Sequence, residues 1–259
     1  IRVQSHTNPA TGSTSVANFS VDNTPPTILG AVTKDMDGNG KVDRAEVTFS
    51  EPVRDSSFSA GKFSIEGVPA TSLDSGSEND NYFELNFSTQ IPGTGVKNLV
   101  YTPGAGADLA VPGNLLAGVT VTAEDQAGPV FLSAKTKTTT TIEAIFSEDL
   151  DGNTVNDSGN EFTVSGHTVS GADETSPGIV TLTLLTTMET DETPDVTFDP
   201  GDSVFEDLAG NQAVSPTTRT APDGTAPVLT DVSIESDNDL NTEFAKVDDT
   251  IILIFTTSE

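Results

Sequence analysis

Apolar and polar residues alternate with a period of two along most of this chain. Ala45, Val47 and Phe49 are separated by polar residues, and Ile142 and Ala144 repeat the arrangement later on. Such alternation is typical of strands that bury one face, and clusters of Gly, Pro, Asn and Asp separate the segments. The pattern predicts strands at 27–33, 45–50, 62–66, 81–88, 96–102, 116–123, 130–136, 142–146, 161–165, 178–185, 195–199 and 213–220.

The same short sequences return along the chain. Phe-Ser-Glu ends a strand at 49–51 and again at 146–148, and Thr-Ser-Glu stands in that place at 257–259. Asp22, Asp125 and Asp223 each open a proline-containing segment ahead of an apolar strand, at intervals of about a hundred residues, which is the size of one β-sandwich domain. The chain is therefore predicted to be a tandem array.

Six or seven short strands in each repeat, with no convincing amphipathic helix, predict an all-β fold of tandem immunoglobulin-like antiparallel β-sandwiches. We expect complete domains at 24–124 and 125–222. Residues 1–23 are expected to be the C-terminal strands of a preceding domain, and residues 223–259 the N-terminal part of a further one. The chain would then be a segment of a longer protein.

These phrases resemble bacterial immunoglobulin-like repeats. The resemblance rests on the Pro-Pro or Ala-Pro entry, on Phe-Ser-Glu-Pro-Val at 49–53 and Phe-Ser-Glu-Asp-Leu at 146–150, and on Asp-Leu-Ala-Gly-Asn at 207–211. Repeats of this kind occur in S-layer proteins and in giant surface adhesins. The resemblance implies a structural or spacing role, although a fold alone does not assign a function.

One motif predicts a metal site. Residues 35–46 match the calcium-loop pattern D-x-[DN]-x-[DN]-G-x5-E at every fixed position, and apolar strands flank them, so we expect a hairpin loop with Glu46 on the outer face of the second strand. The alternative is an acidic turn that binds nothing, and residues 135–141 of the next repeat offer no such ligand set. The predicted Ca2+ ligands are Asp35, Asp37, Asn39, the carbonyl of Lys41, Asp43 directly or through water, and Glu46.

Three further groups of oxygen donors are weaker candidates. One is a loop after the second Phe-Ser-Glu, one is the first hairpin of the third repeat, and one is a set at the junctions between domains. For the first, a solvated loop is the alternative; for the last, calcium would stiffen the array as it does in cadherins. These residues are, in turn, Asp149, Asp151, Asn153 and Asp157; Asp237 and Asp239; and Glu51, Glu148, Asp125, Asp223 and Asp207.

The composition of the chain limits the classes of binding partner that can be expected. Forty acidic residues against eleven basic ones give a net charge of −29, which argues against nucleic acid and anionic lipid and favours divalent cations. Solubility or a saline habitat is the alternative explanation of the charge. Nothing approaches the run of roughly 18 apolar residues that a membrane helix needs, so we expect no membrane contact by this segment. With no cysteine, disulfides and thiolate sites are excluded.

A catalytic site is not predicted. The two histidines, His6 and His167, stand apart, and no nucleophile, phosphate-loop or dinucleotide motif is present. Three sequons beginning at Asn18, Asn86 and Asn156 offer acceptors for glycans, although Phe follows the first two and would serve equally as a core residue.

The sequence therefore predicts a non-enzymatic structural segment of a calcium-stabilised extracellular surface protein of the S-layer or sheath-forming kind. Its expected partners are calcium ions, like subunits in a surface array and glycans. The first alternative is the stalk of a repetitive adhesin, and the second is an accessory module of an exported hydrolase.

Overall fold

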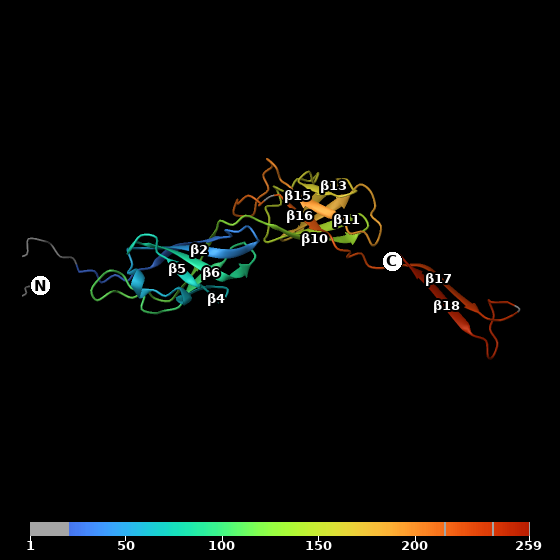
Figure 1. Cartoon of the computed structure of the whole chain (residues 1–259), viewed down its shortest axis with the longest axis horizontal. Helices are drawn as coiled ribbons and strands as arrows, with labels where there is room; N and C mark the ends of the chain where they lie inside the picture. Colours follow the sequence, from blue (N-terminus) through green and yellow to red (C-terminus); the bar gives the residue numbers. More distant parts are fainter. Residues whose placement is uncertain (1–20, 215, 240, 259) are drawn as a thin grey trace, which may run out of the picture.

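The computed structural model describes residues 21–214, 216–239 and 241–258. Two β-sandwiches and a two-stranded hairpin follow one another in a row, so that the described molecule is elongated (Figure 1). Strands form almost all of its regular structure, together with two short 3-10 helices, Asp55–Ser57 and Ala60–Lys62. The predicted all-β sandwich fold is confirmed. The prediction for residues 1–20 lies outside the described residues.

The first sandwich joins a five-stranded sheet to a four-stranded one. The larger sheet has the order β5-β6-β2-β1-β9, in which only the last pair is parallel, and the smaller has the order β4-β3-β7-β8. The strands of the first sheet are β1 (Ile28–Lys34), β2 (Lys41–Phe49), β5 (Ser72–Asp74), β6 (Tyr82–Pro92) and β9 (Glu124–Asp125); those of the second are β3 (Phe63–Ile65), β4 (Val68–Pro69), β7 (Asn98–Tyr101) and β8 (Val119–Thr122).

The core of this sandwich is aromatic. The inward side chains of β2 are fully buried, as the alternation predicts, and the ring of Phe49 meets the ring of Phe83 edge-on with centroids 5.1 Å apart. Burying each such ring contributes about 1.5–3 kcal/mol, which is how a thin core compensates for a low apolar content.

The second sandwich repeats the plan. Its sheets have the orders β10-β11-β14-β13 and β12-β15-β16, and a separate core forms around Phe146 and Phe198, whose centroids are 5.2 Å apart. Its strands are β10 (Phe131–Thr138), β11 (Thr141–Phe146), β12 (Phe162–Val164), β13 (Val169–Ser176), β14 (Ile179–Leu184), β15 (Asp195–Phe198) and β16 (Thr217–Thr220).

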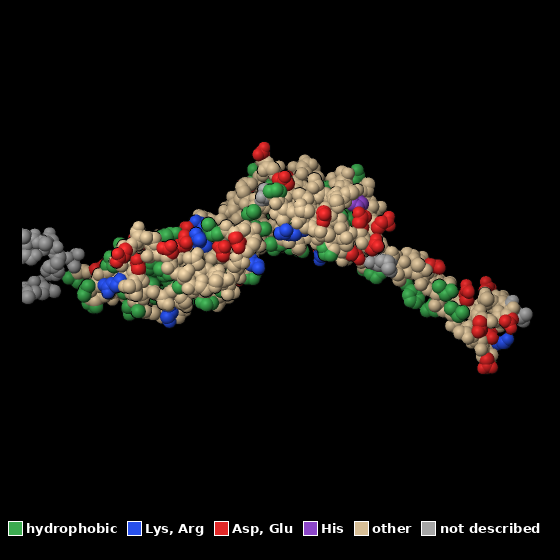
Figure 2. Space-filling model, viewed as in Figure 1, with side chains coloured by type: hydrophobic (Ala, Val, Ile, Leu, Met, Phe, Trp, Pro, Cys, Tyr) green, Lys and Arg blue, Asp and Glu red, His purple; other side chains and the backbone are tan. Residues whose placement is uncertain are grey.

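The third element is an antiparallel hairpin of β17 (Leu229–Ser236) and β18 (Ile251–Thr257). It corresponds to β1–β2 and β10–β11 of the sandwiches, and most of its apolar side chains are exposed, as the green atoms at the right of Figure 2 show.

In the described part of the chain, no helix has the length and apolarity required to cross a membrane.

Candidate metal centres

The hairpin loop between β1 and β2 gathers three carboxylates. Ligand oxygens of Asp35, Asp37 and Asp43 lie within 4.8 Å of one another. Asp35 is held in place by backbone amides, since its Oδ2 accepts a hydrogen bond from Gly40 N at 2.7 Å and its Oδ1 accepts one from Gly38 N at 2.9 Å. Burial raises the pKa of Asp35 above its ordinary value, although these amide bonds oppose the rise. Three of the predicted calcium ligands are thus brought together.

Two amide side chains complete the loop. Asn39 Nδ2 donates to Asp37 Oδ2 at 2.9 Å and also to Gln90 Oε1 at 2.9 Å, while Gln90 Nε2 donates to Asp37 Oδ2 at 2.9 Å. Gln90 was not predicted. It arrives through a bulge in β6, which leaves residues 87–90 opposite the single residue Asp43 of β2.

The structure does not bring Glu46 into this group. Its carboxylate instead accepts a hydrogen bond from Lys34 Nζ at 2.6 Å, on the outer face of the sheet. The reason is the rise of the chain: three residues of strand carry Glu46 about 10 Å beyond Asp43, whereas three residues of helix would advance it only about 4.5 Å and return it to the same side. Lys41, the predicted carbonyl ligand, begins β2 and pairs with Pro92.

A second cluster lies at the start of the second sandwich. Carboxylate oxygens of Asp125, Glu148 and Asp207 lie within 4.8 Å of one another. Asp125 ends the linker strand β9, Glu148 follows β11, and Asp207 belongs to the loop before β16. Asp125 and Asp207 are 5% and 2% exposed. The structure therefore unites three of the predicted junction residues.

Burial dominates the electrostatics of this cluster. It raises the pKa of Glu148 to about 9, and the charges of Asp125 and Asp207 add to the rise, while a hydrogen bond from Thr94 opposes it. Burial likewise raises the pKa of Asp125, with a further contribution from the charge of Asp207. Carboxylates that are both close together and buried repel one another strongly, so a proton or a cation at the cluster lowers its free energy.

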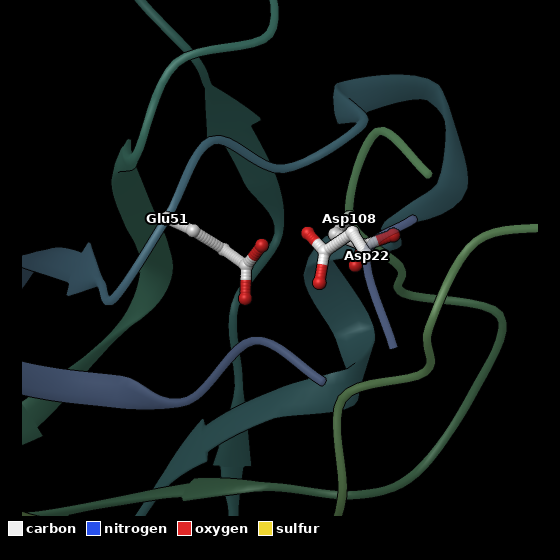
Figure 3. A group of neighbouring side chains, drawn as sticks. All are labelled: Asp22, Glu51 and Asp108. Carbon is white, nitrogen blue, oxygen red and sulfur yellow. The ribbon is translucent and has the colours of Figure 1, made fainter. Parts of the chain in front are cut away.

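The first sandwich carries an equivalent cluster. Figure 3 shows the carboxylates of Asp22, Glu51 and Asp108 turned toward one another from three separate segments of the chain, and their oxygens lie within 4.8 Å. Burial raises the pKa of Glu51, and the charges of Asp22 and Asp108 add to the rise. Sequence reasoning named Glu51 but missed Asp22 and Asp108 as ligands.

An asparagine holds each cluster to its linker. Asn114 Nδ2 donates to Asp108 Oδ2 at 2.7 Å and to the carbonyl of Asp22 at 3.3 Å. Asn211 Nδ2 donates in the same way to Asp207 Oδ2 at 2.8 Å and to the carbonyl of Asp125 at 3.1 Å. Burial alone would raise the pKa of Asp108, but its hydrogen bonds from Asn114 and from backbone amides hold it below the ordinary value.

The remaining candidates form no such group. In the described residues, none of Asp149, Asp151 and Asp157 belongs to a set of three acidic groups within 4.8 Å. Asp151 Oδ1 accepts hydrogen bonds from Asn153 N at 3.0 Å and Asn153 Nδ2 at 2.7 Å, which makes this segment a self-bonded turn. The structure does not support a shared site there.

The third repeat is similar in this respect. Asp237 Oδ1 accepts a hydrogen bond from Thr250 N at 2.7 Å and so closes its own loop. Within the described residues, Asp239 belongs to none of the groups of three acidic residues. Asp223 Oδ1 accepts hydrogen bonds from Thr225 N at 2.8 Å and Thr136 Oγ1 at 3.3 Å. It occupies the place that Asp22 and Asp125 hold in the two sandwiches.

The donor sets of all three clusters suit a hard divalent cation. Each consists of carboxylate oxygens from three residues, and amide oxygens or backbone carbonyls lie beside them. Calcium takes six to eight oxygen ligands in irregular geometry, so that carbonyls and waters readily complete a partial shell. The residues present therefore fit the predicted metal.

No protein-family model and no curated protein sequence matches the chain. Among solved structures, the N-terminal part of the bacterial S-layer protein SbsC is similar over 77% of this chain and 45% of its own, at 15% identity and a TM-score of 0.32. SbsC domains 1–6 are similar over 91% of this chain and 33% of their own, at 13% identity and a TM-score of 0.33.

The Escherichia coli adhesin FdeC is similar over 90% of this chain and 72% of its own, at 16% identity and a TM-score of 0.26. The chain thus spans less than half of the length of both SbsC structures.

Proposed function

We propose that this chain is a structural segment of a calcium-stabilised extracellular surface protein that forms an S-layer or a comparable sheath. The observation that carries the proposal is the repetition of one acidic cluster at the same end of two consecutive sandwiches. A repeated site at the domain ends serves an array, because it acts on how one domain meets the next. The sequence resemblance to bacterial immunoglobulin-like repeats supports the same role.

Calcium is proposed at the three clusters. Asp125, Glu148 and Asp207 would hold the ion at the junction of the sandwiches; Asp22, Glu51 and Asp108 would hold its equivalent; and Asp35, Asp37 and Asp43 would hold the ion in the hairpin loop. A bound ion supplies the positive charge that buried carboxylates lack and favours the folded state by mass action. This also offsets the self-repulsion of a chain with a net charge of −29.

A mechanical role is proposed in place of catalysis. His167 has both ring nitrogens engaged, with Nδ1 at 3.0 Å from Thr186 Oγ1 and Nε2 at 2.8 Å from Glu192 Oε1, and these contacts tie down a loop of the second sandwich. The three acidic clusters consist of carboxylates without an imidazole or a thiol, and the hydroxyl beside Glu148, that of Thr94, is fully buried. Their chemistry is that of cation binding.

The test is thermal unfolding of the full chain in excess calcium and in chelator. We expect calcium at a hundredfold excess over its Kd to add about 2.7 kcal/mol for each occupied site. Asp125→Asn with Asp207→Asn should remove one such increment. The matched control is Asp173→Asn with Asp202→Asn, which neutralises two exposed acids of the same sandwich. Equal calcium responses in the two double variants would contradict the proposal.

The elongated row in Figure 1 also favours the stalk of an adhesin as a second candidate. Electron microscopy of the protein after calcium addition separates the two candidates. Ordered two-dimensional arrays are expected of an S-layer or sheath protein, while separate rods are expected of a stalk.

A further inference from the structure

We propose that the first sandwich carries a preformed docking surface for the second sandwich, which we call the seat. This surface makes the junction between the two sandwiches rigid instead of flexible. The seat consists of the hairpin loop at 35–40 and of Gly93 and Thr94 at the end of β6. Its contacts are packing and hydrogen bonds between protein groups, and we expect them to persist without the cations proposed at the hairpin loop and at Glu148.

The linker itself is held from both sides. Glu124 and Asp125 pair with Val32 and Thr33 of β1 in the first sandwich, and Gln126 N donates to the carbonyl of Thr33 at 3.1 Å. Two residues later the chain belongs to the second sandwich. A Cβ built at Gly128 would lie only 1.9 Å from the carbonyl oxygen of Gln212. The free span between the two bodies is therefore shorter than a flexible linker needs.

Two glycines of the seat approach the second sandwich closely. A Cβ built at Gly40 would lie 2.6 Å from Leu132 Cδ2 and 3.0 Å from Ser147 Cβ, and one built at Gly93 would lie 3.0 Å from the carbonyl oxygen of Ser147. Both glycines also have positive φ, +82 and +74. The absence of a side chain at these two positions allows the two bodies to meet.

A hydrogen-bonded contact lies beside this packing. Thr94 is fully buried, its Oγ1 is 2.6 Å from Ser147 Oγ, and it also donates to Glu148 Oε1. A hydroxyl this deeply buried costs free energy unless it is bonded, and here its partners belong to the other sandwich. The contact therefore favours one relative orientation.

The seat is specific to this junction. In the second sandwich a tight turn between Thr138 and Thr141 replaces the loop at 35–40, so the element that reaches across the first junction is shortened there. The next body is met through other groups, among them Thr190, whose Oγ1 donates to the carbonyl of Ser258 at 2.8 Å.

The test is the distance between two spin labels on the full chain, measured by double electron–electron resonance. The chain has no cysteine, so Ser72→Cys on β5 and Asp173→Cys on β13 place one label on an exposed strand position of each sandwich. The disrupting variant is Gly40→Ala with Gly93→Ala. Its matched control is Gly67→Ala with Gly76→Ala, two turn glycines that also have positive φ, +80 and +64, but whose added Cβ would meet open space.

We expect one narrow distance distribution for the parent in calcium and in chelator alike. The disrupting variant should shift or broaden it by about twofold, toward the spread of a flexible linker, and the control should leave it unchanged. Leu132→Asp, at a position already 37% exposed, repeats the test on the other side of the junction if the glycine variant fails to fold.

Two results would overturn the seat. One is a parent distribution that is broad in chelator and narrow only in calcium, which would leave the junction to the ion alone. The other is a disrupting variant, together with Leu132→Asp, that gives the parent distribution. The first result would itself support calcium binding, and the second leaves the thermal test of calcium binding unaffected, so the two proposals fail separately.

Discussion

The acidic clusters at the starts of the two sandwiches are built from equivalent residues in different surroundings. Asp22 is exposed, whereas its counterpart Asp125 is 5% exposed. Glu148 is covered by Thr94 and Gly95 of the first sandwich, and within the described residues no domain covers Glu51 in that way. The same three carboxylates thus occur once inside a junction and once at a place that no domain covers within the described residues.

The comparison shows what the junction adds. Burial raises the pKa of both glutamates, but only for Glu148 does the rise reach about 9. Docking of one sandwich on the next removes water from the cluster and strengthens the repulsion among its charges. An uncovered cluster tolerates the absence of a cation, whereas a covered one needs either a proton or a cation.

The largest expected effect is a pH dependence of the protein in chelator. Because the folded-state pKa of Glu148 lies above its ordinary value of 4.5, the folded state binds more protons than the unfolded state, and stability falls as the pH rises from about 4.5 to about 9. The free energy of unfolding falls by at most about 1.4 kcal/mol for each pH unit between these two pKa values. Denaturant unfolding between pH 5 and 9 measures it.

Glu148→Gln should flatten this dependence and stabilise the chelated protein at pH 8, whereas Glu51→Gln should change it little. Parallel pH profiles for the parent and Glu148→Gln would mean that the covered cluster carries no such cost.

Next in size is the loss of the asparagine that holds each cluster. Asn211→Ala removes the side-chain donor to Oδ2 of the buried Asp207 carboxylate and should lower the free energy of unfolding by about 1–3 kcal/mol. Asn114→Ala removes the donor of an equally buried carboxylate, that of Asp108. It should still cost less, because water can replace the donor at the carbonyl of the exposed Asp22. Urea unfolding of both variants decides the order, and a larger loss for Asn114→Ala would contradict it.

The smallest expected effect concerns the hydroxyl of Thr94. Thr94→Val keeps the shape but removes the hydrogen bonds to Ser147 and Glu148, and should lower stability in chelator by about 1 kcal/mol. Thr71→Val is the matched control, because it also removes two hydrogen bonds of one hydroxyl, which at this exposed position donates to the Asn86 carbonyl and accepts from Ser88 N. Equal losses in the two variants would show that the junction gains nothing from this contact.

Much of the fold follows from the alternation of residues. The inward positions Ala45, Val47 and Ile142 are fully buried, as predicted. The strand β13 escaped prediction because Val169–Ser176 is polar and acidic, as suits a strand at a sheet edge. The parallel strand β9 was not predicted, because a strand of two residues is too short to show an alternation of apolar and polar positions.

The candidate sites divide along similar lines. Asp35, Asp37 and Asp43 could be predicted because a loop motif is local in sequence. Glu46 lies on the outer face of β2, as predicted, but its carboxylate does not join the loop carboxylates. The motif that made it a ligand comes from helix-flanked loops, whereas here a strand carries Glu46 away from the loop. Gln90 depends on a bulge in a partner strand that no local pattern reveals.

Asp22 and Asp108 were within reach of the sequence. The repeat sets Asp108-Leu109-Ala110 against Asp207-Leu208-Ala209 and sets Asp22 against Asp125. Carrying the junction set of one repeat onto the other would have identified both residues. What the sequence could not supply is the difference in burial, which arises only when one sandwich packs on the next.

Calorimetric titration of the full chain with calcium at neutral pH tests whether the covered cluster of Asp125, Glu148 and Asp207 binds calcium. We expect Glu148→Gln with Asp207→Asn to remove one binding event, while the control Asp173→Asn with Asp202→Asn leaves the titration unchanged. Identical titrations for the parent and the cluster variant would show that this cluster does not bind calcium.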